Sequence, residues 1–357
     1  MSPSIKTAGA AVPTSSRGFY RVAIVGAGSL KGKEVAEVLD QRNFPAGDVK
    51  LLDDEDSLGK LKALKDEVTF IQSVRAEQFE KIDFTFFAEG ADTTEKNSKL
   101  ALASGSAIVD LTYALENDPG AAVRAPSVER QFGQFNTPDL QPGPVVAAHP
   151  VAVALALILG RLASVSSITS SAATVLQPAS EYGQKGMDEL HEQTISLLSF
   201  QPLPKKYFDV QVAFNAVSRY GEQAVSRLVS VNERIVRHYR KIMPAQTPVP
   251  SVLVLQAPTF HSYAVSLNVK LSSAADIAEL SKSLAGEHVK LVPGSEESPS
   301  NVNAAGQDDI LVCMLPDASD PNSAWISIAF DNLRVAAITA VECAETMAAS
   351  RPRGQVQ

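Results

Sequence analysis

The stretch Tyr20–Gly32, YRVAIVGAGSLKG, decides how the first part of the chain folds. Its first six residues alternate and then become wholly apolar, which is typical of a buried parallel strand. A glycine turn follows, and beyond it Val35, Val38 and Leu39 stand at helical spacing. A strand, a glycine turn and a helix in this order predict a βα unit of a nucleotide-binding fold.

Three further candidate strands continue this pattern and alternate with helical segments. They are Val49–Leu52, Asp83–Phe87 and Ala107–Asp110. Strands that alternate with helices imply right-handed crossovers and a parallel sheet. The sequence therefore predicts an α/β protein whose N-terminal domain is built on a Rossmann-type parallel sheet.

From about residue 167 the apolar residues recur with period two, as in strands of a half-covered sheet. Phe208–Asn215 is one of these candidate strands, and a polar helix is expected over about Ser230–Met243. The Ala-rich segment Asp331–Met347 predicts a helix that packs back on the first domain. We expect a flexible tail over 1–18, a Rossmann-type domain over 19–150 completed by 331–357, and an α/β dimerisation domain with a largely antiparallel or mixed sheet over 151–330.

Composition excludes several classes of protein. The 357 residues are 45% hydrophobic and 20% charged, a composition that disfavours wholesale disorder. A formal net charge of -8 disfavours a nucleic-acid partner, because phosphate binding draws on clustered Lys and Arg. Only two cysteines, Cys313 and Cys343, and no H-x-x-x-H pair are present, so no metal is expected.

The chain also lacks the usual signs of membrane targeting. Its longest apolar run, Pro150–Leu159, is too short to span a bilayer. Residues 1–18 lack the apolar core of a signal peptide. We therefore expect a cytoplasmic protein without a membrane partner.

The glycine turn offers a candidate cofactor site, with the spacing G-x-G-x-x-x-G, one residue longer than the dinucleotide fingerprint. Amide groups at the start of such a helix approach a pyrophosphate. The candidate cofactor-binding residues are Gly26, Gly28, Ser29, Leu30 and Gly32. The alternative is a plain βα turn that uses its glycines for packing.

An acidic run bears on the choice of cofactor. Asp53 stands 21 residues after Gly32, at the end of the second strand, where a carboxylate binds the ribose 2′-OH of NAD. Asp54, Glu55 and Asp56 follow and would repel the 2′-phosphate of NADP. If a nicotinamide cofactor binds, NAD is preferred over NADP. The alternative is a solvated acidic loop.

Several segments carry a resemblance to a known family. Besides the first turn they are Leu51–Lys60, Val109–Leu115, Gln177–Leu190, Val212–Asn215, Asn232–Met243 and Asp331–Arg334. Together they resemble the aspartate-semialdehyde dehydrogenase family, in particular its Usg-type branch, over nearly the whole chain. The resemblance implies a Rossmann domain completed by the C-terminal helix, a homodimer formed through the second domain's sheet, and a cofactor contact at Asn332.

The family's covalent reaction requires particular side chains, so the corresponding positions of this chain can be compared with them. It converts an acyl phosphate to an aldehyde with NADPH through a Cys thioester. The segment that resembles its A-N-P-N-C-T is Ala148–Val153, so the nucleophile position is Ala152. Its R-V-P-V-x-x-G-H resembles Gln256–Tyr263, which puts Gln256 at the substrate Arg position and Tyr263 at the His position.

Other positions depart from the family or keep to it. Glu116 stands at the position of a phosphate-binding Arg, and Ser29 replaces the central Gly of the cofactor turn. Gln177 is retained at the substrate-orienting Gln position, and Arg234 stands at the Lys position of a helix. By this comparison the nucleophile, the base, the carboxylate anchor and the phosphate cations are absent.

These positions favour a non-catalytic or repurposed paralogue that keeps the dimeric fold and binds NAD, a small-molecule metabolite or another enzyme. Two alternatives remain. One is a nicotinamide-dependent oxidoreductase without a covalent intermediate, in which Tyr263, or His261 on the same strand face, acts as acid and base. The other is an active aspartate-semialdehyde dehydrogenase of amino-acid biosynthesis.

Overall fold

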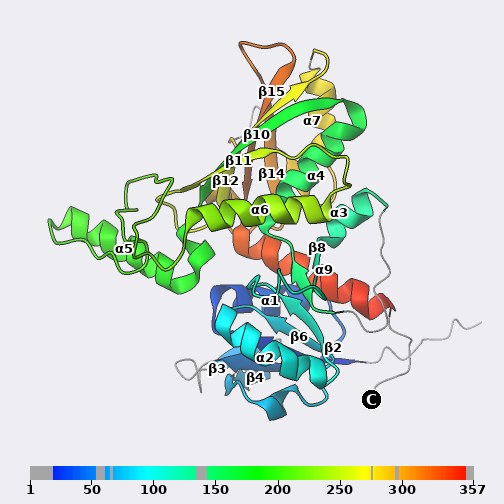
Figure 1. Ribbon diagram of the computed structural model, residues 1–357, viewed down its shortest axis with the longest axis vertical. Coiled ribbons are helices and arrows are strands. Elements are labelled where there is room, and N and C mark those ends of the chain that lie inside the picture. The colour runs from blue at the N-terminus through cyan, green and yellow to red at the C-terminus, as the bar shows by residue number, and fades with distance from the viewer. Residues whose placement is uncertain are drawn as a thin grey trace, which may run out of the picture.

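Two sheets, one above the other in Figure 1, organise the molecule, with helices α6 (Leu228–Ile242) and α9 (Asn332–Ser350) between them. The structure, a computed structural model, describes residues 19–53, 61–64, 67–133, 143–274, 276–293 and 297–350. The predicted tail over 1–18 and the acidic residues Asp54, Glu55 and Asp56 lie outside the described residues.

The first sheet has seven strands in the order β5-β2-β1-β6-β7-β9-β8, and all its neighbouring strands are parallel. The strands are β1 (Tyr20–Val25), β2 (Ala46–Asp53), β5 (Gln72–Ser73), β6 (Phe84–Phe87), β7 (Ala107–Asp110), β8 (Ala122–Arg124) and β9 (Val145–Ala147). Strands β6 and β7 are buried at every residue, which explains why apolar residues dominate both. The predicted parallel sheet is confirmed. A separate antiparallel hairpin joins β3 (Leu61–Leu64) to β4 (Glu67–Phe70).

Helices cover this sheet, and the last one comes from the far end of the chain. They are α1 (Leu30–Gln41), α2 (Ala91–Ala103), the short α3 (Pro126–Gln131), the 3-10 turn η2 (Ala76–Phe79) and α9. Val341 of α9 belongs to the same apolar cluster as Val22 of β1 and Val35 of α1. Arg334 of α9 also makes ion pairs with Glu34 and Glu37 of α1, both at 3.3 Å.

The second sheet is mixed and has six strands in the order β11-β10-β12-β15-β14-β13. They are β10 (Ile168–Gln177), β11 (Ser251–Gln256), β12 (Tyr263–Leu271), β13 (Val289–Leu291), β14 (Ile310–Pro316) and β15 (Ser323–Phe330). The accompanying helices are α4 (Pro150–Val165), η3 (Ala179–Tyr182), α5 (Gly183–Leu198), α6, α7 (Ile277–Leu284) and α8 (Asn301–Ala304). The predicted mixed sheet is confirmed, and so is the polar helix that α6 provides.

One segment differs from its expected structure. Phe208–Asn215 forms a loop, not a strand. Phe208 and Val212 are buried, but Phe214 is 67% exposed. The amides bond to side chains of α5: Phe208 N donates to Glu189, and Val212 N donates to Gln193. Side-chain acceptors here take the hydrogen bonds that a neighbouring strand would accept. A period-two pattern of apolar residues cannot distinguish these two arrangements.

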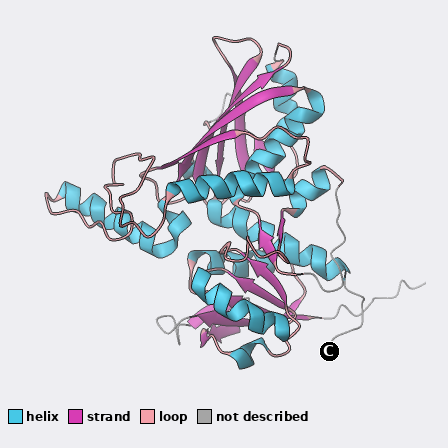
Figure 2. Cartoon of the chain, in the orientation of Figure 1, coloured by secondary structure: helices cyan, strands magenta, loops and turns pink. Residues whose placement is uncertain are grey.

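Helix α5 projects away from both sheets as an arm, visible at the left of Figure 2. Leu198 and Phe200 at its end are largely exposed. Among the described residues, no helix is both long and apolar enough to cross a membrane.

Candidate functional site

The glycine turn closes tightly between β1 and α1. Gly26 has φ +80°, and a Cβ there would come within 2.8 Å of Cβ and N of Glu89. A Cβ on Gly32 would lie 2.1 Å from the carbonyl oxygen of Gly26. Both positions therefore exclude a side chain, as required where a helix packs directly on its preceding strand.

Ser29 completes this turn. Its hydroxyl donates to the Gly26 carbonyl at 2.7 Å and accepts from the amide of Gly32 at 2.9 Å, which caps α1. The amides of Leu30 and Lys31 belong to the first helical turn, where no intrahelical acceptor exists. The turn thus keeps the geometry of an anion-binding helix start.

Asp53 lies where the sequence placed it, beside the turn. Its Oδ2 accepts from the amide of Gly28 at 2.6 Å. The end of β2 and the glycine turn therefore meet, although they are distant in sequence.

The other predicted positions meet where α4 begins, between the two domains. Ala152 is fully buried in the first two turns of α4 and belongs to the large apolar cluster. His149 caps that helix, since its Nδ1 accepts from the amide of Val151 at 3.2 Å. The Nε2 atom of His149 therefore carries the proton.

His149 faces a carboxylate that the sequence did not single out. Its Nε2 lies 3.8 Å from Oε1 of Glu181, and within the described ranges neither His149 Nε2 nor Glu181 Oε2 has a hydrogen-bond partner. Burial lowers the pKa of His149 well below its usual value, and the positive charge of Arg234 lowers it further. His149 is therefore a neutral, buried donor.

Lys31 and Tyr113 complete this cluster. The Lys31 ammonium lies 3.6 Å from Oε1 of Glu181 and 5.0 Å from the centre of the Tyr113 ring. That ring stacks on His149, with a centroid separation of 5.6 Å. Sequence reasoning missed all four residues because they come from four separate segments. The sequence feature that could have indicated this cluster is Lys31, a charged residue within the glycine turn where a helix begins.

Gln177, Gln256 and Tyr263 are brought together and bond to one another. Gln256 Nε2 donates to the Gln177 carbonyl at 3.0 Å, and Tyr263 OH lies 3.4 Å from Gln177 Oε1. Tyr220 OH donates to Gln256 Oε1 at 2.7 Å. All three predicted positions are fully buried. Burial raises the pKa of Tyr263 well above its usual value, and the Glu181 carboxylate raises it further.

His261 does not share the strand of Tyr263, contrary to expectation. Strand β12 begins at Tyr263, and Ser262 has φ +68°, outside the extended region. The alternation of a strand therefore does not extend to His261, which is only half-buried.

Asn332 lies at the start of α9 and joins three segments. Its Oδ1 accepts from Ser180 Oγ at 3.1 Å and from the amide of Ser262 at 3.3 Å. Its Nδ2 and the hydroxyl of Ser262 are buried and lack partners within the described part of the chain. These two atoms are available to a bound polar group.

Glu116 and Arg234 form a pair across the domain boundary. Arg234 Nε lies 3.2 and 3.3 Å from the two carboxylate oxygens of Glu116, and His238 Nε2 lies 2.9 Å from Oε2. Burial would raise the pKa of Glu116, but the bond from His238 and the charges of Arg234 and Arg237 outweigh it and lower the pKa to about 2.

A pH dependence of stability follows from this pair. A carboxyl whose pKa falls from 4.5 to about 2 on folding stabilises the protein above pH 4.5, and this contribution is lost as the pH falls toward 2. Its size is about 2 kcal/mol once solvent screening is allowed for. Glu116→Gln should therefore flatten the curve of urea-unfolding free energy between pH 4.5 and 3. An unchanged slope in the variant would contradict the pairing.

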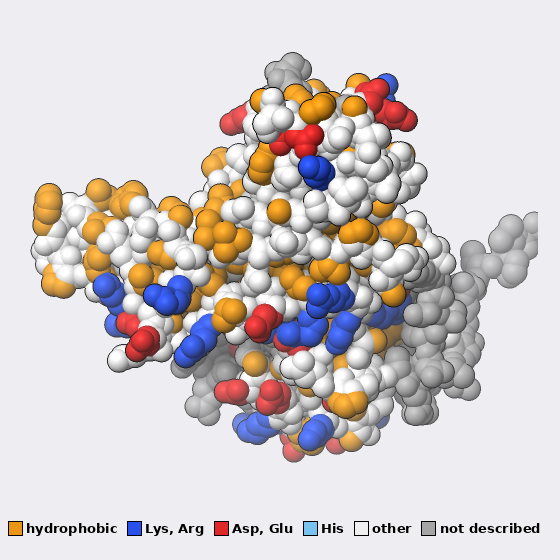
Figure 3. Space-filling model, turned by 45° about the horizontal axis from the view of Figure 1, so that its top comes forward, with side chains coloured by type: hydrophobic (Ala, Val, Ile, Leu, Met, Phe, Trp, Pro, Cys, Tyr) orange, Lys and Arg blue, Asp and Glu red, His pale blue; other side chains and the backbone are white. Residues whose placement is uncertain are grey.

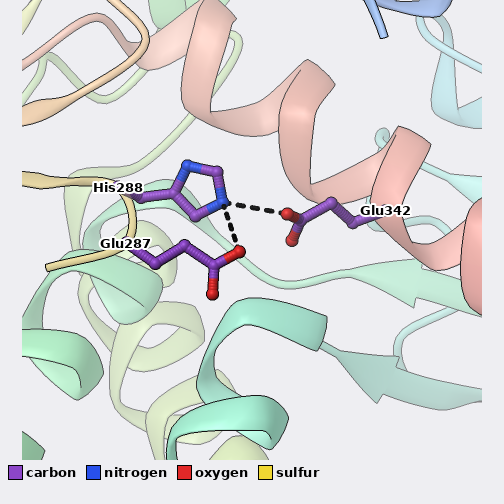
Figure 4. Close-up of side chains that lie close together, drawn as sticks. All are labelled: Glu287, His288 and Glu342. Carbon is purple, nitrogen blue, oxygen red and sulfur yellow. Dashed lines mark hydrogen bonds and ion pairs between the residues drawn. The ribbon is translucent and has the colours of Figure 1, made fainter. Parts of the chain in front are cut away.

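One group of side chains has the composition of a metal site. Figure 4 shows Glu287, His288 and Glu342, with their ligand atoms within 4.8 Å of one another. Arg130, however, donates to Glu287 at 2.6 Å and to Glu342 at 2.7 Å. The arginine supplies the positive charge that a cation would bring, so the group is an ion-pair network that ties the loop after α7 to α9.

Comparison with known proteins places this geometry in a family. The family model described as "Semialdehyde dehydrogenase, NAD binding domain" matches residues 21–133, and "Semialdehyde dehydrogenase, dimerisation domain" matches 159–335. A USG-1 protein homolog from Azotobacter vinelandii is 31% identical over 335 residues, covering 91% of this chain and 97% of that protein.

An aspartate-semialdehyde dehydrogenase from Rickettsia bellii is 28% identical over 341 residues, covering 92% of this chain and 97% of that protein. The structure of a probable aspartate-semialdehyde dehydrogenase from Pseudomonas aeruginosa superposes with a TM-score of 0.81 at 27% identity, over 92% of this chain and 98% of that one. The resemblance inferred from the sequence is confirmed: the chain belongs to the semialdehyde dehydrogenase family.

Proposed function

We propose that this chain is a repurposed member of its family that does not carry out covalent, phosphate-dependent aldehyde oxidation. The observation that carries the proposal is Ala152. It stands at the family's nucleophile position, and its methyl group has no lone pair with which to form a thioester. It is fully buried in an apolar cluster, so a neighbouring side chain has no space to take its place.

The surrounding positions support the same proposal. Gln256 is neutral and satisfies its amide within the Gln177–Tyr220 network, so it brings no charge to hold a substrate carboxylate. Tyr263 has a pKa raised well above its usual value, so it remains protonated at neutral pH and cannot accept a proton as a histidine base would.

Intact-mass measurement tests the missing covalent step directly. The protein is incubated with aspartate semialdehyde and NADP without phosphate, so that an acyl-enzyme would accumulate, and is then quenched in acid. We expect the unmodified mass alone. A stoichiometric acyl adduct that disappears on addition of phosphate would overturn the proposal.

We infer further that the chain retains a nicotinamide site and prefers NAD. The glycine turn at the start of α1 fits a pyrophosphate, and the unpaired Asn332 Nδ2 and Ser262 hydroxyl fit a carboxamide. A bound nicotinamide would supply a hydride carrier. The chain's own contribution is to hold it, with Asp53 beside the turn to accept hydrogen bonds from a ribose diol.

Titration calorimetry with NAD and NADP tests this preference. We expect NAD to bind at least ten times more tightly, because a 2′-phosphate beside Asp53 meets like charge worth about 1–4 kcal/mol. Asp53→Asn should reduce the ratio. Tighter NADP than NAD would contradict the acidic-loop argument. If neither nucleotide binds, the result would favour a purely structural or partner-binding role for the protein.

We also propose that the chain forms a homodimer through the outer face of its second sheet. The β-sheet register places Thr174, Leu253, Ser266 and Trp325 on one face, and Leu253 is 52% exposed. Apolar side chains are also spread over the α5 arm at the left of Figure 3. Exposed apolar side chains that gather on one sheet face are typical of an interface.

Light scattering at micromolar concentration tests the dimer. We expect a dimer for the wild type and a shift toward monomer for Leu253→Lys, because a charge would be buried at the interface. Val302→Lys is the control, since Val302 is 78% exposed on α8 outside this face. A monomeric wild type, or equal dissociation by both variants, would contradict the proposed interface.

A second candidate function is non-covalent hydride transfer, and the unpaired His149 Nε2 beside Glu181 favours it. A substrate hydroxyl would satisfy both groups, since it accepts from His149 Nε2 and donates to the Glu181 carboxylate. Reduction of NAD by a panel of small hydroxy acids, lost in His149→Asn, would support this function. Absence of turnover across the panel would count against it.

A further inference from the structure

The face of α6 that meets the first domain concentrates positive charge. Its positions i, i+3, i+4 and i+7 are Arg234, Arg237, His238 and Lys241, which therefore lie along one stripe. The side chains of Arg234 and Arg237 are 25% and 36% exposed, so solutes reach the cluster from solvent. Figure 3 shows Lys and Arg side chains gathered near the middle of one face of the molecule.

All four side chains converge on one residue, Glu116. Besides Arg234, Arg237 Nη2 donates to Oε1 at 2.8 Å, and Lys241 Nζ donates to the main-chain carbonyl at 3.0 Å. His238 is fixed as a donor, because its Nδ1 accepts from the amide of His149 at 3.0 Å and leaves the proton on Nε2. The carboxylate is thus held from several sides, as a bound anion would be.

The cluster has more positive charge than Glu116 neutralises. Arg234, Arg237 and Lys241 carry three positive charges. Among the described residues the two arginines form ion pairs with Glu116 alone, and Lys241 donates to the main-chain carbonyl of Glu116. The Nε atom of Arg237 is buried and has no hydrogen-bond partner within those residues. Surplus guanidinium donors of this kind suit an oxyanion of higher charge than a carboxylate.

The segment that carries Glu116 is also held in place by a second residue, Tyr113. Tyr113, three residues earlier, has φ +65°, a backbone conformation that costs free energy in a bulky residue. The centre of its ring lies 5.0 Å from the Lys31 ammonium and 4.8 Å from the Arg234 guanidinium. The stacking of Tyr113 holds the segment in place independently of the Glu116 carboxylate.

We propose that Arg234, Arg237, His238 and Lys241 form an oxyanion-binding site whose built-in occupant is Glu116. By occupying the site, Glu116 excludes inorganic phosphate and phosphorylated ligands from the wild-type protein. It is therefore a specificity-determining residue. This inference goes beyond the proposed function, since it concerns binding and holds whether or not position 152 supports chemistry.

Calorimetric titration with inorganic phosphate at constant ionic strength tests the site. Glu116→Ala removes the carboxylate and leaves its space, so we expect phosphate to bind at least ten times more tightly than to the wild type. Glu116→Asp keeps the charge and should gain nothing. Adding Arg237→Met to Glu116→Ala should abolish the gain, because it removes a guanidinium from the site.

Three results would overturn the proposal. They are wild-type affinity for phosphate equal to that of Glu116→Ala, no gain in Glu116→Ala, or a gain that survives Arg237→Met. Circular dichroism checks the fold of each variant, and Glu116→Ser replaces Glu116→Ala if the latter does not fold. No outcome depends on catalysis, so failure here is distinct from failure of the proposed function.

Discussion

Purified protein is expected to show no phosphate-dependent reduction of NADP with aspartate semialdehyde above a no-enzyme control. Removal of the nucleophile from a covalent mechanism costs a factor on the order of 10⁶ in kcat, and we propose that Ala152 occupies the nucleophile position. The built-in carboxylate of Glu116 further opposes phosphate at the neighbouring cations. Continuous absorbance of the reduced cofactor measures the rate.

Restoring the thiol alone should also fail. Ala152→Cys supplies a nucleophile, but Gln256 and Tyr263 still lack the positive charge and the basicity that the reaction requires. Intact-mass measurement after thiol alkylation, compared with the wild type, reports whether the introduced thiol is reactive. Turnover by the wild type that survives repurification would disprove the loss of activity. Turnover by Ala152→Cys would show that the nucleophile alone was missing.

Arg130→Met is expected to destabilise the protein by about 3–5 kcal/mol, because it leaves a buried carboxylate with an incomplete set of partners. Glu342 is 1% exposed, and Arg130 is one of the cations that compensate it. Burial would raise the pKa of Glu342, but the bond from His288 and the charge of Arg130 lower it below its usual value. Methionine keeps the aliphatic stem of the arginine, so the measured loss reports the charge. Urea unfolding at pH 7 gives the free energy.

Glu287→Gln provides the matched control in the same network. Glu287 contacts the same guanidinium but is 50% exposed, so its loss should cost less than about 1 kcal/mol. Equal destabilisation by the two variants would mean that burial of Glu342 does not set the strength of this network.

The layout of both sheets could be predicted from the chain because hydrophobic periodicity records burial. Val22–Val25 and Ala107–Val109 lie in strands with neighbours on both sides and are apolar throughout, whereas Tyr263–Leu271 alternates because only one face of its sheet is covered. The same rule was wrong for Phe208–Asn215, where Glu189 and Gln193 supply the hydrogen bonds of a missing strand.

The candidate site was predictable only in part. The resemblance fixed which positions to compare, and it led to Ala152, Gln256 and Tyr263. It did not indicate that Gln177 and Gln256 bond to each other, nor that Glu116 recruits Arg237 and Lys241 in addition to Arg234. Those contacts join segments more than 75 residues apart in the chain.

By itself, then, the sequence determined the α/β class and the glycine turn, and the resemblance indicated which positions to compare with the family's functional residues. Local spacing and side-chain chemistry are enough for these features. Only the tertiary structure decided that Lys31, His149 and Glu181 meet at the start of α4, and that Glu116 lies within a cluster of cations. The physical reason is that burial and charge pairing depend on which surfaces the domains bring together, and a single sequence carries no period that records such long-range contacts.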